Sequence, residues 1–194
     1  MKQQSFIAKT PKHELEVEVL SKLVSRDVFD VKKEQFRKMC EDGCSNYGKK
    51  YSCPPFSPSF EKFQNSFENF LVVMYSINLN QLANFDYSDY QKLQIGNAVI
   101  KPRLEKYMRS LENKTNTQFF STGACRLCKP CKGKLGEPCA KPNDKRYSLE
   151  ASGVDCNKLA MDVFDRPLLW YKNKTAPEYT SVIAAIPVSE TFSF

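Results

Sequence analysis

The run Phe70-Leu-Val-Val-Met-Tyr-Ser-Ile77 is the longest apolar-rich stretch in this sequence of 194 residues. It is much shorter than the roughly 18 apolar residues that a membrane-spanning helix needs, but it has the length of a strand. Its β-branched and aromatic side chains favour extended backbone, so we predict a buried strand from Leu71 to Asn78.

Patterns typical of strands also occur on both sides of this run. Upstream, alternating apolar and polar residues predict a strand within residues 13–24. Downstream, residues 179–188 predict a final strand, and residues 117–122 are a shorter candidate. At least three of these segments are apolar enough to be buried.

Helical signals lie between the predicted strands. Ser88 and Gln91 have the spacing of a capping box, and the apolar residues that follow recur at helical spacing. Pro102 lies within this pattern, so we expect the helix to kink or split near its middle. Two shorter helices are predicted after the cap candidates Asp30 and Asp155.

Strands and helices are interspersed, which favours an α+β (or α/β) fold. We expect one compact domain over residues 1–194, because two full domains would be cramped at this length. It would contain a mixed sheet of about four strands, flanking helices, and cysteine-rich loops at one end. Whether residues 1–30 form a peripheral N-terminal segment is left open.

The eight cysteines call for an explanation other than disulfides. The N-terminus leads into a charged segment without the apolar region of a signal peptide, and no apolar run is long enough for a membrane helix. We therefore expect a cytoplasmic protein without membrane contact, in which thiols stay reduced. Clustered cysteines in that compartment indicate metal binding.

The second cysteine group has the pattern Cys125-x2-Cys128-x2-Cys131-x7-Cys139, followed by Pro142. Its first three members have the spacing of ferredoxin-type loops, in which thiolates converge on a 4Fe-4S cluster. Cys139 is the natural fourth ligand, although its gap exceeds that of the ferredoxin pattern. Structural zinc is the alternative, but zinc is usually held by two separate pairs of cysteines.

The first cysteine group has only three members, in the pattern Cys40-x3-Cys44-x8-Cys53, and two prolines follow directly. Three thiolates could hold a cluster with one iron open to water, substrate or a non-cysteine ligand. They could instead share a site with another cysteine, or line the core as free thiols. The prolines would stiffen the loop beside the last thiol.

Cys156 and His13 remain outside both groups. Cys156 would begin the helix capped by Asp155, where the helix dipole can lower a thiol pKa, but packing in the core is the preferred interpretation. His13 is the only histidine and is distant from every cysteine in sequence. Zinc sites that need two histidines are therefore excluded.

The net charge of +7 is concentrated around the cysteines. Residues 125–146 carry seven Lys or Arg against two acidic residues, and residues 32–50 carry six against three. Basic surroundings favour the more negative, reduced form of a cluster and attract acidic proteins. We therefore expect an acidic redox partner, whereas the modest charge does not favour nucleic acid.

Three segments resemble the signatures of an uncharacterised family of predicted metal-binding proteins from bacteria and archaea, a domain of unknown function. They are Cys40-Glu-Asp-Gly-Cys44-Ser-Asn-Tyr47-Gly48-Lys-Lys-Tyr-Ser-Cys53-Pro54-Pro55, then Gly123-Ala-Cys125-Arg-Leu-Cys128-Lys-Pro-Cys131 with Glu137-Pro138-Cys139 and Pro142, and then Arg146-Tyr-Ser148-Leu-Glu150-Ala151-Ser-Gly153-Val-Asp155. The resemblance spans about residues 35–190. It implies metal binding by seven cysteines, while Cys156 falls where the family pattern has an apolar residue.

The predicted metal ligands are Cys40, Cys44, Cys53, Cys125, Cys128, Cys131 and Cys139. They would hold one or two 4Fe-4S clusters or, in the alternative, zinc. The preferred function is electron transfer or a redox accessory role. The alternatives are an enzyme that uses an open iron of the three-cysteine site on an unknown small substrate, and a zinc-stabilised structural or nucleic-acid-binding module. No catalytic residue and no other cofactor site is predicted.

Overall fold

The computed structural model describes residues 1–193, and within them four strands form one sheet in the order β1-β2-β3-β4. The strands are β1 (Lys2–Lys9), β2 (Glu14–Ser25), β3 (Asn69–Asn78) and β4 (Tyr179–Val188). The α+β class is confirmed, but the expected mixed sheet is wrong, because every neighbouring pair is antiparallel. The chain leaves β3 and re-enters β4 at the same end, where Asn78 pairs with Tyr179, so this distant pair is antiparallel too.

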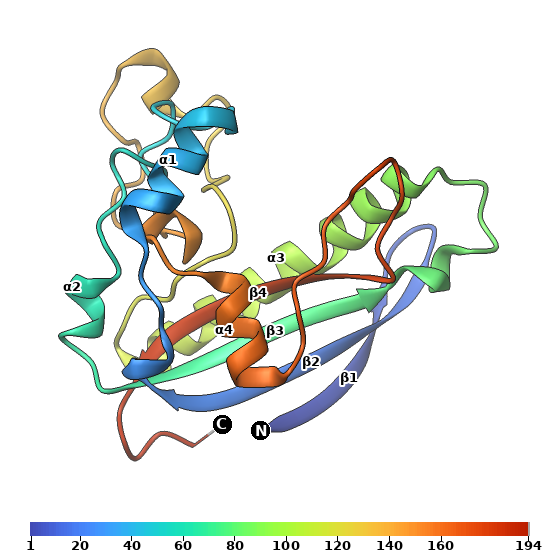
Figure 1. The fold of residues 1–194 in the computed structure, drawn as a ribbon, viewed down its shortest axis with the longest axis horizontal. Coiled ribbons are helices and arrows are strands. Elements are labelled where there is room, and N and C mark those ends of the chain that lie inside the picture. The colour runs from blue at the N-terminus through green and yellow to red at the C-terminus, as the bar shows by residue number, and fades with distance from the viewer. Residues whose placement is uncertain (194) are drawn as a thin grey trace.

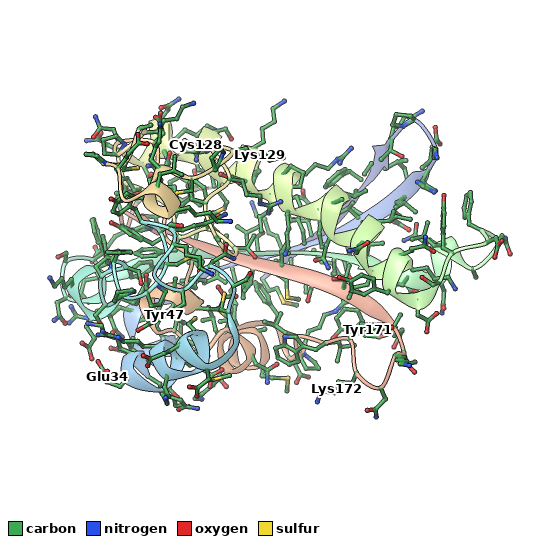
Figure 2. The ribbon with its side chains drawn as sticks, turned by 90° about the horizontal axis from the view of Figure 1, so that it is seen from above. Glu34, Tyr47, Cys128, Lys129, Tyr171 and Lys172 are labelled. Atoms are coloured by element: carbon green, nitrogen blue, oxygen red, sulfur yellow. The ribbon has the colours of Figure 1, made fainter. Side chains whose placement is uncertain are left out.

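The apolar run in β3 is buried on both faces of the sheet, which explains why it is uninterrupted. Leu71 and Val73 face α3 (Asp89–Thr115), whereas Val72 and Met74 pack on the other face with α4 (Cys156–Phe164). Successive strand side chains point to opposite faces, so one strand supplies both halves of the core. Figures 1 and 2 show α3 and α4 on opposite faces of the sheet.

Helix α3 begins with the predicted capping box, in which the Ser88 hydroxyl accepts from the Gln91 N–H and the Ser88 N–H donates to the Gln91 side chain. Of the two outcomes expected at Pro102, a kink or a split, the split does not occur, because α3 is continuous through it. Pro102 cannot donate a backbone hydrogen bond. Burial of a long apolar stripe that includes Leu104 and Met108 offsets this loss of stability.

The remaining helices are short. They are α1 (Lys33–Gly43) and α2 (Glu61–Gln64), with the 3-10 turns η1 (Arg26–Val28), η2 (Leu79–Leu82), η3 (Lys132–Leu135) and η4 (Glu150–Ser152). Asp155 caps α4 as predicted, since its side chain accepts from the Lys158 N–H. Asp30 does not cap α1, because Lys32 occupies that position and its ammonium lies 3.1 Å from the Asp30 carboxylate.

Two segments differ from the predicted strands. The segment 117–122 forms only isolated bridges, from Phe120 to Ala185 at the edge of β4 and from Ser121 to Ser148. β1 was not predicted, and β2 is an inner strand that pairs with both β1 and β3. None of the helices in residues 1–193 combines the length and the apolar character needed to cross a bilayer.

Candidate metal centre

The first cysteine group is brought together by the end of α1 and a tight loop. Cys40 lies in the last turns of α1, and the N–H of Cys44, the residue after the helix, donates to the Cys40 carbonyl at 3.0 Å. The loop then folds back, because Gly48 adopts a positive φ of 65° and its N–H donates to the Pro54 carbonyl at 2.9 Å. Cys53 is thereby returned toward the helix and is buried, with 7% of its surface exposed.

The three thiols of this group lie close enough to influence one another. Burial raises the pKa of Cys53; the Ser52 hydroxyl and the Lys50 charge lower it in part, and the charges of Cys44 and Cys40 raise it. The pKa of Cys40 is also raised by burial first, and then by Cys44 and Glu150. Thiols in this environment keep their protons unless a cation replaces them, so a bound metal would relieve the cost of burying the thiolates.

All four thiols of the second cysteine group line one small cavity. The cavity is bounded by Cys125, Cys128, Cys131 and Cys139, with Lys132, Lys141 and Lys145 among its other walls. The loop curves around it because η3 follows Cys131 directly and Gly136 ends that turn with a positive φ of 70°. The structure therefore places Cys139 with the three closely spaced cysteines, in a cavity that lysine residues also line.

The two cysteine segments are docked against each other. The Ser52 hydroxyl accepts from the Cys125 N–H at 3.0 Å and lies 3.8 Å from the Cys53 sulfur. The Lys50 ammonium donates to the Cys125 carbonyl at 3.0 Å. Gly133 approaches the Lys49 carbonyl so closely that a Cβ there would lie 2.9 Å from its oxygen. The two groups are thus neighbours that share one interface.

Both cysteine segments project from the same part of the sheet (Figure 1), where α1 lies beside the loop that contains η3. Figure 2 shows Tyr47 and Cys128 at this end of the molecule, whereas Tyr171 lies near the other end of β4.

The donor chemistry of both groups fits a metal, because thiolates are ligands of zinc and of iron–sulfur clusters. Among residues 1–193, no three His, Cys, Asp or Glu side chains come together closely enough to hold one metal ion. A zinc ion would bind four thiolates in a tetrahedron, with zinc–sulfur bonds of about 2.3 Å. A 4Fe-4S cluster would take one thiolate on each iron.

A comparison with protein families identifies the chain. The family model described as predicted metal-binding protein (DUF2284) matches residues 25–185. The chain belongs to this family. The match to DUF2284 includes all seven predicted ligands, β3 and most of β4, whereas β1 lies outside it. Searches of curated proteins and of solved structures gave no match.

Cys156 differs from the candidate ligands in its burial, although it borders the same cleft as Cys40 and Cys44. Only 3% of its surface is exposed, and it packs with Leu159 and Ala160 of α4 in the apolar cluster under that helix. Burial raises its pKa well above the ordinary value, and the charge of Glu150 adds to the effect. The helix start therefore does not produce an accessible thiolate. His13 lies elsewhere and contacts the Tyr87 hydroxyl at 3.1 Å.

Three polar residues at this end were not predicted as functional. Ser52 joins the two groups, and Glu150 and Lys101 border the same cleft as Cys40. The sequence offered two signals for these residues: Ser52 directly precedes Cys53, and Glu150 lies within the third signature segment. Nothing in the helical pattern of α3 distinguishes Lys101 from its other lysines.

Proposed function

We propose that this protein carries iron–sulfur clusters and acts in electron transfer or as a redox accessory protein. The observation that supports this most is the cavity bounded by the four thiols of the second cysteine group. A 4Fe-4S cluster takes four thiolates, and three of these have the spacing of a ferredoxin loop. Membership in the DUF2284 family supports metal binding without naming the metal.

The spacing of the second group favours a cluster over zinc, because three of its thiols have the spacing of a ferredoxin loop, whereas zinc is usually held by two separate pairs. Lys132, Lys141 and Lys145 line the same cavity, and their charges would stabilise the additional electron of a reduced cluster. A structural zinc site would not transfer electrons, because zinc has no redox chemistry.

The first cysteine group would hold a second cluster, with three thiolates and one iron open. Its neighbour across the Ser52 contact is the second group, so electrons would have a short route between the two centres. Such oxygen-sensitive chemistry suits a reducing compartment, and we place the protein in the cytoplasm.

The partner we propose is an acidic electron-transfer protein. Arg126, Lys129, Lys134 and Lys141 are exposed around the second group. A basic face accelerates encounter with an acidic partner, and this attraction weakens as the salt concentration rises.

The decisive experiment is to purify the protein without oxygen and measure iron, acid-labile sulfide and zinc per chain. We expect a brown protein with equal iron and sulfide, about eight irons for two clusters or about four for one. Cys131→Ser should remove the cluster of the second group and Cys53→Ser that of the first, whereas Cys156→Ser should keep both. A colourless protein that contains zinc and no sulfide would contradict the proposal and support the zinc module instead.

An enzyme that uses the open iron is the second candidate function. The specific observation in its favour is that Cys40 and Cys44 line a wide cleft, whereas the cavity of the second group is small. An open iron at such a place could act as a Lewis acid on a bound molecule.

A further inference from the structure

The cleft beside the first cysteine group is a large hollow of about 980 Å³. This is at the upper end of the volumes of small-molecule sites, which run from about 300 to 1,000 Å³. The end of α1, with Cys40 and Cys44, forms one wall. Other walls are lined by residues of α3 and of the segment that contains Trp170, and residues 180–183 of β4 form the base.

The base of the cleft is the free edge of the sheet. β4 is an edge strand, and at Ala185 its N–H and C=O point outward and bond with Phe120. Because this direction alternates along an antiparallel strand, Ser181 and Ile183 also turn their N–H and C=O groups outward. Both residues line the cleft, where no other segment of residues 1–193 pairs with them. The cleft therefore presents backbone donors and acceptors that a ligand can use.

Three polar side chains lie around this base. One Glu150 carboxylate oxygen and the Ser181 hydroxyl are buried without a hydrogen bond in residues 1–193, and the Glu150 side chain is also a hydrogen-bond partner of Cys156. The half-buried Lys101 forms no ion pair in the same part of the chain, and the positive charge of Arg126 acts on it together with the negative charge of Glu150. An ammonium group near a second cation can pair with an acidic ligand that enters the cleft.

Apolar side chains surround these polar groups. Met39 and Trp170 line the cleft and are 59% and 56% exposed. Phe36, Leu93 and Leu168 contribute to the other walls. An apolar hollow with a few converging polar groups is the usual form of a small-molecule site.

We infer that this cleft binds a small organic anion, whose acidic group pairs with Lys101 and whose apolar part lies against Trp170. A peptide strand fits less well, because Tyr179, Ser181 and Ile183 are the only residues that turn their backbone groups outward from the start of β4 to the Phe120 bridge. A peptide added there would form few ladder hydrogen bonds.

The site deepens the proposed function, and its role as a substrate site rests on that proposal. Cys40 and Cys44 lie on its wall, so a molecule held by Lys101 would be next to the centre of the first group. The cluster of the second group has no such access, because its thiols line a different cavity.

Trp170 is the only tryptophan, so its fluorescence reports on the cleft alone. The probe is 8-anilinonaphthalene-1-sulfonate, an aromatic anion, with uncharged N-phenyl-1-naphthylamine for comparison. We expect saturable binding of the anion by calorimetry, with energy transfer from Trp170 that is lost in Trp170→Phe. Lys101→Met should weaken binding of the anion by about tenfold or more, and binding of the neutral probe by less than about threefold. Lys106 is an exposed lysine on α3, and Lys106→Met should change the affinity for neither probe.

Absence of saturable binding, or equal anion affinity in Lys101→Met and the parent protein, would overturn the binding site. Iron and sulfide are measured in the same samples. Anion binding to a protein without iron would support the binding site and contradict the proposed cluster. A protein that contains iron and sulfide but does not bind the anion would support the cluster and contradict the binding site. In loaded protein the anion should also alter the electron paramagnetic resonance of the reduced first-group cluster. Binding without that change would overturn the substrate role.

Discussion

The sheet with its two covering helices and the cysteine-bearing end (residues 40–57 and 122–146) are stabilised in different ways. Nearly every residue of β3 is buried, and apolar clusters occupy both faces of the sheet. In contrast, no residue from 122 to 146 is buried, and single hydrogen bonds such as that from Cys125 to Ser52 hold this segment in place. A segment that buries so little apolar surface needs another source of stability, and a metal centre can supply it.

The largest effect should therefore follow removal of the metal. In the loaded protein we expect slow amide hydrogen exchange in both regions. After the metal is stripped anaerobically with a chelator, residues 40–57 and 122–146 should exchange rapidly, because their ordering depends on metal–thiolate bonds. β2, β3 and β4 should keep their protection, because apolar burial stabilises them independently. Mass-spectrometric hydrogen exchange measures both regions in one experiment.

Loss of protection in the sheet together with the cysteine-bearing end would contradict the independent stabilisation of the two regions. In that case the metal would stabilise the whole domain and the two regions would unfold as one unit. Reloading with iron and sulfide should restore slow exchange to the cysteine-bearing end alone.

The second effect concerns the anchor between the two regions. The Arg146 guanidinium donates to both carboxylate oxygens of Glu112 on α3, at 2.5 and 2.9 Å, and both side chains are largely buried. Arg146→Ala leaves Glu112 buried without a counter-charge, so the free energy of unfolding should fall by about 3 kcal/mol. Lys158→Ala, which removes an exposed pair with Asp162, should cost no more than about 0.5 kcal/mol.

Urea unfolding of these variants gives the required free energies. The pair Glu112→Leu with Arg146→Met removes both charges together and should recover most of the loss, because no unpaired charge remains buried. Equal losses for Arg146→Ala and Lys158→Ala would show that the anchor contributes no more than a surface pair.

The two regions also differ in how well the sequence predicted them. β2 and α3 carry periodic apolar patterns, whereas β3 and β4 carry continuous apolar runs, because one face of the first two and both faces of the last two are buried. β1 was not predicted, because Ala8 is its one buried residue and its sequence shows no alternation of apolar and polar residues. The cysteine spacings predicted the second group as a unit, but the contact between the groups depends on the Ser52 hydroxyl, which no spacing encodes.

The third effect concerns that contact. Ser52 is 1% exposed, and Ser52→Ala would leave the half-buried Cys125 N–H without its acceptor. We expect a loss of about 1–2 kcal/mol in the free energy of unfolding of the loaded protein. Ser110→Ala removes an exposed hydroxyl on α3 and should cost less than about 0.5 kcal/mol. A difference in hydrogen exchange confined to β3 and β4 in Ser52→Ala would contradict the assignment of Ser52 to the cysteine-bearing end.

The smallest effect belongs to the sheet and appears only at high pH. Tyr75 of β3 is 6% exposed, and burial, with a smaller contribution from Tyr107, raises its pKa from 10.0 to about 12. The unfolded chain then releases the phenol proton at lower pH than the folded one. The stabilisation from a protonated Tyr75 is therefore complete below about pH 10 and is lost as the pH rises through about 12.

Tyr75→Phe keeps the buried ring and removes this titration. Relative to the parent protein, the variant should be more stable at about pH 11 than at about pH 8, by about 1 kcal/mol after allowance for solvent near the hydroxyl. Urea unfolding at the two pH values measures the difference, and the cysteines and lysines that titrate in the same range are common to both proteins. A pH-independent difference would mean that the Tyr75 hydroxyl reaches solvent, and that the apolar face under α3 is less closed than the burial of β3 indicates.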